Sequence, residues 1–107
     1  MKKIFIILIM IIMVIGCDKN VDINKLMQEN EYIIIDVRTK QEYNQEHLKG
    51  AINIPYDELD DTIDKNKILF VYCKSGTRSQ IAFETLTNLG YEVYDLGAFS
   101  QIDLPKE

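Results

Sequence analysis

The residue types that build common metal sites are scarce in this sequence. Its 107 residues include no tryptophan, one histidine (His47) and two cysteines, of which Cys17 is assigned below to a lipid. A protein zinc site usually takes four ligands from cysteine, histidine and carboxylate side chains. One histidine and one available cysteine cannot supply that set, so we expect no metal and no cofactor.

An excess of basic residues is also missing. Lysine and arginine number 12 against 17 aspartates and glutamates, which gives a formal net charge of −5. A nucleic-acid-binding domain needs a basic surface to meet the phosphates, so that class of partner is excluded. The acidic stretch from Asp57 to Asp64 is predicted to be a solvated face. With neither repeats nor low-complexity segments, this length predicts one domain.

No hydrophobic run is long enough to span a membrane. The longest extends from Ile4 to Ile15, about a dozen residues, whereas a membrane-spanning helix needs roughly 20. It follows the basic start Met1-Lys2-Lys3, a pattern typical of a secretory signal peptide. The alternative, a buried core helix, is disfavoured because the run has neither a polar face nor a capping residue.

The end of this run resembles the lipobox of bacterial lipoproteins. Its residues are Val14-Ile15-Gly16-Cys17. In that family the chain is cut before the cysteine, which carries the lipid, so the resemblance implies that Cys17 anchors the protein to a membrane. Asp18 resembles an inner-membrane retention signal in organisms with two membranes. We therefore expect an exported protein, anchored to the cell membrane, or to the periplasmic side of the inner membrane where there are two.

The remaining chain alternates strand and helix patterns. We divide it into a signal peptide (1–16), a lipidated cysteine with its tether (17–23) and a folded domain (24–107). The predicted elements are a short helix over Asn24–Gln28, a strand over Ile33–Ile35, a helix over Lys40–His47, a strand over Gly50–Pro55, a short helix or turn over Tyr56–Lys65, a strand over Ile68–Tyr72, a helix from Ser79 to Leu89 and a strand over Tyr91–Leu96. This alternation predicts an α/β fold with a parallel sheet and helices on both faces.

The most informative motif is Cys73-Lys74-Ser75-Gly76-Thr77-Arg78-Ser79, which lies between a predicted strand and a predicted helix. A cysteine attacks as its thiolate, and a free thiol with a pKa of about 8.5 is mostly protonated at neutral pH. Backbone N–H groups of a loop folded around the sulfur, together with the positive end of the helix from Ser79, stabilise a thiolate. Gly76 permits the tight backbone that such a loop needs. The alternative is an inert, buried structural cysteine.

Two cations flank the same loop. Lys74 and Arg78 add positive charge near Cys73, and a guanidinium can hold an anionic substrate by two parallel hydrogen bonds. Asp36 and Arg38 are predicted to pair with each other or with nearby backbone and to shape the edge of the site. His47 is a candidate base, but we favour a structural role because a preformed thiolate needs little help from a base.

Several blocks, taken in order, resemble a rhodanese domain and extend from about Asn24 to Leu104. They are Asp36-Val37-Arg38, Glu42-Tyr43, His47 to Pro55, Cys73 to Ser79 and Leu89-Gly90-Tyr91. The resemblance implies a parallel sheet flanked by helices, with an active-site loop at the end of a strand. It also implies a sulfurtransferase whose cysteine takes a sulfane sulfur, often from thiosulfate, and passes it to cyanide or a thiol.

On this resemblance Cys73 is the nucleophile that carries the persulfide. The loop that cradles it consists of Lys74, Ser75, Gly76, Thr77 and Arg78. The implied partners are a small anionic sulfur donor and a thiol or cyanide acceptor, and we expect a monomer.

The sequence departs from the family's pattern in two places. The usual Gly-Gly-Trp end is replaced by Gly97-Ala98-Phe99, where Phe99 is expected to supply the packing, and only Val21-Asp22-Ile23 represents the N-terminal strand. Two other functions remain open. One is a non-catalytic module that binds or senses, although such modules usually lack the cysteine. The other is a phosphatase or arsenate reductase of the related fold, which carries one more residue between cysteine and arginine.

Overall fold

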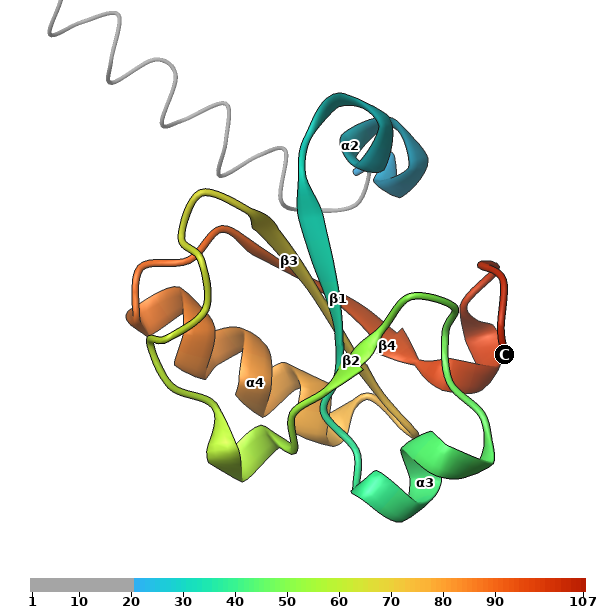
Figure 1. Ribbon diagram of the computed structural model, residues 1–107. Coiled ribbons are helices and arrows are strands. Elements are labelled where there is room, and N and C mark those ends of the chain that lie inside the picture. Colours follow the sequence, from blue (N-terminus) through green and yellow to red (C-terminus); the bar gives the residue numbers. More distant parts are fainter. Residues whose placement is uncertain (1–20) are drawn as a thin grey trace, which may run out of the picture.

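The computed structural model describes residues 21–107 (Figure 1). The predicted signal peptide, the lipidation site Cys17 and most of the tether lie outside the described residues. Within the described part of the chain, no helix has the length and apolar character needed to cross a membrane.

A four-stranded parallel sheet forms the centre of the domain, as predicted. Its order is β2-β1-β3-β4, where β1 is Tyr32–Asp36, β2 is Ile52–Asn53, β3 is Ile68–Cys73 and β4 is Val93–Ala98. The two inner strands are rich in β-branched and aromatic residues, and β3 is buried along its whole length. Strands buried on both faces favour such apolar runs. The pairing of Asp36 with Tyr72 aligns the carboxyl ends of β1 and β3.

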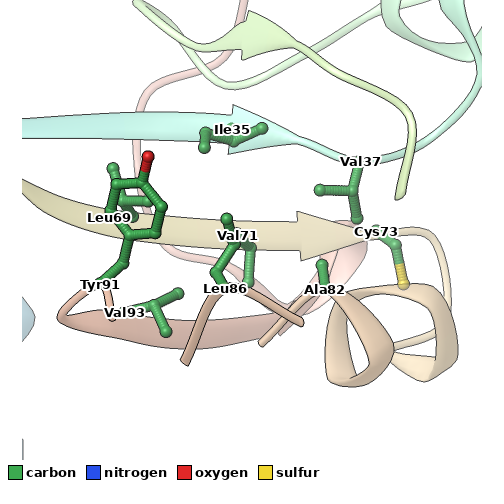
Figure 2. Close-up of a cluster of buried hydrophobic side chains, with 9 residues drawn as sticks. All are labelled: Ile35, Val37, Leu69, Val71, Cys73, Ala82, Leu86, Tyr91 and Val93. Carbon is green, nitrogen blue, oxygen red and sulfur yellow. The ribbon is translucent and has the colours of Figure 1, made fainter. Parts of the chain in front are cut away.

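Helices cover both faces of the sheet, which confirms the predicted fold class. On one face α4 (Thr77–Asn88) and the short helix η1 (Tyr56–Glu58) pack over the buried cluster drawn in Figure 2. On the other face lie α2 (Ile23–Glu29), α3 (Lys40–Gln45) and the short helix η2 (Phe99–Gln101). Successive residues of a strand point to opposite faces, so Tyr72 joins the second cluster and Cys73 the first.

Several predicted boundaries are wrong. No strand forms at Val21–Ile23; Ile23 begins α2 instead, and the Asp22 carboxylate accepts the Lys25 N–H at 3.1 Å as an N-cap. The long helix begins at Thr77, two residues before Ser79, because Gly76 turns the chain into its first turn. The strand predicted over Gly50–Pro55 is reduced to Ile52–Asn53, and the last strand is shifted toward Ala98.

Candidate active site

The loop between β3 and α4 folds back over the sulfur of Cys73. Cys73 ends β3 and is fully buried, and three residues later the Gly76 N–H donates to its Sγ at 2.9 Å. Gly76 has a φ of 99°, a left-handed conformation that side chains disfavour. The glycine therefore directs its amide at the sulfur, as the sequence predicted for this loop.

A second group at the sulfur, the hydroxyl of Ser79, was not among the predicted site residues. Its Oγ lies 3.6 Å from Cys73 Sγ and donates to the Gly76 carbonyl at 3.1 Å. Ser79 is fully buried in the first turn of α4. Sequence reasoning used this serine only to mark the start of the helix. A polar residue on the inward face of that first turn was the available signal.

These groups favour the thiolate of Cys73. Burial alone raises the pKa of Cys73, because it removes the charged form from water. Hydrogen bonds from the Ser79 hydroxyl and from the backbone N–H groups of Ser79, Gly76 and Ser75 act in the opposite direction. Their combined effect is larger, so the pKa of Cys73 falls below its ordinary value. Dipoles and hydrogen bonds, rather than a cation in contact with Sγ, stabilise this charge.

The two loop cations have different surroundings. Lys74 is exposed, as are Ser75 and Thr77. Arg78 makes a two-pronged bond, but to a protein carboxylate: its Nη1 and Nη2 lie 2.8 and 3.2 Å from the Glu42 oxygens. We expected this geometry toward an anionic substrate. The Arg78 guanidinium in turn lowers the pKa of Glu42 to about 2.

Asp36 and Arg38 pair with each other, as predicted, but on the opposite face of the sheet from Cys73. Arg38 Nη2 lies 2.7 Å from Asp36 Oδ2 and also donates to the Glu46 carbonyl at 2.6 Å. The Tyr72 hydroxyl donates to the same carboxylate at 2.9 Å. The guanidinium lies 4.5 Å from the centre of the Phe99 ring, so Phe99 supplies the expected packing.

His47 is held by structural contacts. Its Nδ1 lies 2.8 Å from the Tyr43 carbonyl, and its ring stacks on that of Tyr43 with 3.8 Å between centroids. Its Nε2 lies 3.4 Å from a Glu107 carboxylate oxygen. Residues 21–107 contain no group of three or more His, Cys, Asp or Glu side chains that could hold a metal ion.

Comparisons with known proteins agree with this geometry. The family model for the rhodanese-like domain matches residues 20–102. The thiosulfate sulfurtransferase PspE of Escherichia coli is 44% identical over 78 residues, covering 67% of this chain and 75% of that protein. The thiosulfate sulfurtransferase GlpE of Coxiella burnetii is 33% identical over 76 residues, covering 67% of this chain and 71% of that protein.

Solved structures give the same family. One described as a rhodanese with anions from E. coli superimposes with a TM-score of 0.65 at 40% identity, covering 71% of this chain and 96% of that one. A rhodanese-related protein from Thermoplasma volcanium gives a TM-score of 0.63 at 30% identity, covering 75% of this chain and 81% of that one. The chain belongs to the rhodanese-like domain family and is a sulfurtransferase of the rhodanese type.

Proposed function

We propose that the protein moves a sulfane sulfur from thiosulfate to cyanide or a thiol through a persulfide on Cys73. The observation that carries this proposal is the buried Cys73 sulfur, which accepts the Gly76 N–H at 2.9 Å and has a lowered pKa. The names of two relatives, both thiosulfate sulfurtransferases, support the choice of donor. No cofactor is needed, because the reaction exchanges one sulfur–sulfur bond for another.

The proposed cycle has two displacements. The Cys73 thiolate attacks the outer sulfur of thiosulfate, the S–S bond of thiosulfate breaks, and sulfite leaves with the electron pair. Cyanide then attacks the terminal sulfur of the persulfide, the new S–S bond breaks, and its electron pair returns to Sγ as thiocyanate leaves. The loop stabilises the thiolate that begins and ends this cycle.

The charges around the loop favour an anionic donor. Lys74 is exposed beside the nucleophile, and its ammonium group attracts thiosulfate without a fixed geometry. Arg78 orders the loop through its bond to Glu42, 36 residues earlier in the chain. We therefore assign donor attraction to Lys74 and loop order to Arg78.

The phosphatase alternative is disfavoured by the same contacts. A phosphate ester carries a tetrahedral dianion, which such sites bind with a guanidinium and several converging amides. Here the Arg78 guanidinium bonds to Glu42. The non-catalytic alternative is disfavoured because an inert thiol needs neither a lowered pKa nor an amide directed at its sulfur.

A transfer assay with the full chain tests the proposal. Wild type is expected to convert thiosulfate and cyanide to sulfite and thiocyanate, and Cys73→Ser to lose this activity completely because the covalent intermediate cannot form. Lys74→Ala is expected mainly to raise KM for thiosulfate. Thiocyanate formation that survives Cys73→Ser, or hydrolysis of an aryl phosphate without sulfur transfer, would overturn the assignment.

We also propose that Cys17 anchors the protein to the membrane of the cell that exports it. The motif Val14-Ile15-Gly16-Cys17 supports this location. Wild type is expected in the membrane fraction, and Cys17→Ala is expected to lose its lipid and leave that fraction. Wild-type protein in the cytosol with Met1 still attached would contradict both the anchor and the export.

A further inference from the structure

The hydroxyl of Ser79 lies between two acceptors that compete for its single proton. Its Oγ is 3.6 Å from Cys73 Sγ and 3.1 Å from the Gly76 carbonyl oxygen. Both Ser79 and Cys73 are fully buried. A hydroxyl has one proton and two lone pairs, and it rotates to suit its partners, so it donates to only one of the two acceptors at a time.

The preferred partner depends on the state of the sulfur. When Cys73 is a thiol, its S–H donates to Ser79 Oγ, and the Ser79 hydroxyl donates to the Gly76 carbonyl, as in this structure. A thiolate can only accept, and hydrogen bonds to a charged acceptor are the stronger ones. Ionisation of Cys73 therefore favours rotation of the Ser79 proton toward Sγ.

The contacts of the Gly76 carbonyl keep the free-energy cost of this rotation small. Its carbonyl also accepts the Gln80 N–H at 3.1 Å, the first bond of the helix. A carbonyl oxygen has two lone pairs, so it still accepts the Gln80 N–H when the Ser79 hydroxyl turns away. Buried polar groups without any partner are costly, and this arrangement avoids that cost in both states.

We propose that Ser79 is a further catalytic residue of the sulfur-transfer site. Its hydroxyl donates a hydrogen bond to Cys73 Sγ when Cys73 is a thiolate, and to the Gly76 carbonyl when Cys73 is a thiol or a persulfide. The inference rests on the proposed persulfide cycle. In the persulfide the negative charge lies on the terminal sulfur, so Sγ no longer attracts the proton. When the acceptor removes that sulfur, the electron pair returns to Sγ and the hydroxyl turns to stabilise it.

Other charges near Cys73 are the same with and without this hydroxyl. They are Lys74, the next residue in the chain, and Arg78 of α4 with its partner Glu42 of α3. Asp36 and Arg38, at the end of β1 and just after it, pair with each other on the opposite face of the sheet. The pKa of Arg78 is raised chiefly by its bond to Glu42 and to a lesser degree by Cys73. A change in the titration of Cys73 on removal of the Ser79 hydroxyl therefore reports the hydroxyl itself.

The test is the pH dependence of Cys73 alkylation in the full chain, followed on the Cys73 peptide by mass spectrometry. Ser79→Ala is expected to move the midpoint of iodoacetamide labelling to higher pH. Below the wild-type midpoint the labelling rate should fall about tenfold, because a hydrogen bond to a charged group is lost. Above both midpoints the two rates should converge. Ser79→Thr, which keeps a hydroxyl, is expected to keep the wild-type profile.

Thr87→Ala is the matched control, since it removes an exposed hydroxyl from the same helix. It should leave both the profile and the thermal midpoint close to wild type. A Ser79→Ala profile identical to wild type would overturn the inference. The inference would also be overturned if the Ser79→Ala labelling rate were lower by the same factor at every pH. A Ser79→Thr profile shifted as far as that of Ser79→Ala would overturn it as well.

A single-turnover measurement separates this inference from the proposed function. Wild type and Ser79→Ala are loaded with thiosulfate at high pH, where both are thiolates, and then mixed with cyanide. The variant is expected to discharge its sulfur several-fold more slowly, because Cys73 becomes a poorer leaving group as its thiolate loses a donor. Equal discharge rates would overturn the role of Ser79, whereas failure of wild type to load any sulfur would overturn the persulfide cycle.

Discussion

Two buried polar clusters lie at the carboxyl end of the same sheet, on opposite faces. The ion-pair cluster holds Asp36 and Arg38 beside Tyr72, and the thiol cluster holds Cys73 with Gly76 and Ser79. Tyr72 and Cys73 are consecutive residues of β3, so the strand separates the clusters by pointing successive side chains to opposite faces. They differ in how their charges are neutralised.

In the ion-pair cluster every charge has a counter-charge in contact. Arg38 Nε lies 2.9 and 3.0 Å from the two Asp36 oxygens, and its Nη2 adds bonds to the carboxylate and to the Glu46 carbonyl. In the thiol cluster the sulfur meets amide and hydroxyl dipoles. A saturated ion pair holds the fold in place, whereas a charge held by dipoles remains available to react. This contrast assigns structure to one cluster and chemistry to the other.

The largest expected effect on stability comes from breaking the ion pair. Asp36→Ala leaves the Arg38 charge buried without its partner, which should lower the free energy of unfolding by about 3–5 kcal/mol. Urea denaturation measures this loss, with Asp57→Ala on the exposed side of η1 as the control. Sulfur transfer per folded molecule should stay within about twofold of wild type. A stable variant that has lost its transfer activity would contradict the division between the clusters.

Two glycines with the same kind of backbone conformation, one at the sulfur and one away from it, separate the effect of the Gly76 amide from that of backbone strain. Gly76 and Gly50 have φ values of 99° and 84°, and a Cβ built on either meets nothing within 4 Å. Each replacement by alanine should therefore cost about 1–2 kcal/mol of stability from backbone strain alone.

Of these two glycines, Gly76 donates its amide to the Cys73 sulfur, whereas Gly50 donates its amide to a Glu107 carboxylate oxygen. Gly76→Ala should therefore also reduce the rate of Cys73 alkylation about tenfold at neutral pH, because the strained loop moves a donor away from the charged sulfur. Gly50→Ala should leave that rate unchanged. Equal loss of reactivity in both variants would mean that general destabilisation, and not the amide, controls the thiol.

The smallest expected effect is at the Glu42–Arg78 pair, which joins α3 to the first turn of α4. The folded-state pKa of Glu42 is lowered from 4.5 to about 2, so the pair stabilises the fold fully above pH 4.5 and loses this contribution as the pH falls toward 2. Glu42→Gln removes the charge but keeps a side chain able to cap α3 through Thr39. It should cost about 1 kcal/mol or less near neutral pH, because the pair is partly exposed.

Urea denaturation of wild type and Glu42→Gln across this pH range measures the difference, which should shrink on acidification. Glu58→Gln, an exposed carboxylate on η1, is the control and should show no such trend. A difference that grows as the pH falls would contradict the direction of the Glu42 pKa.

The local parts of this account could be predicted from the sequence. The run Ile68–Tyr72 leads into Cys73, and its apolar composition is enough to predict a buried strand that ends there. The Asp36–Arg38 pair was also predictable, since its partners are two residues apart. Glycine at position 76 predicted the turn that brings an amide to the sulfur.

The missed features depend on contacts that local patterns do not encode. Arg78 was expected to face a substrate, and its actual partner Glu42 lies 36 residues away on another helix. Ser79 reaches Cys73 because the loop turns back at Gly76, which brings residues six positions apart into contact. Val21–Ile23 forms no strand, because Ile23 already belongs to α2, the helix predicted over Asn24–Gln28, which packs on the sheet.

The central claim is that the dipole-stabilised sulfur of Cys73 carries the transferred atom. Its most direct test is peptide mass spectrometry of the full chain after incubation with thiosulfate. The Cys73 peptide should gain the mass of one sulfur atom and lose it again on addition of cyanide, with thiocyanate released in equal amount. Sulfur transfer that proceeds at full rate while the Cys73 peptide never gains that mass would contradict the account.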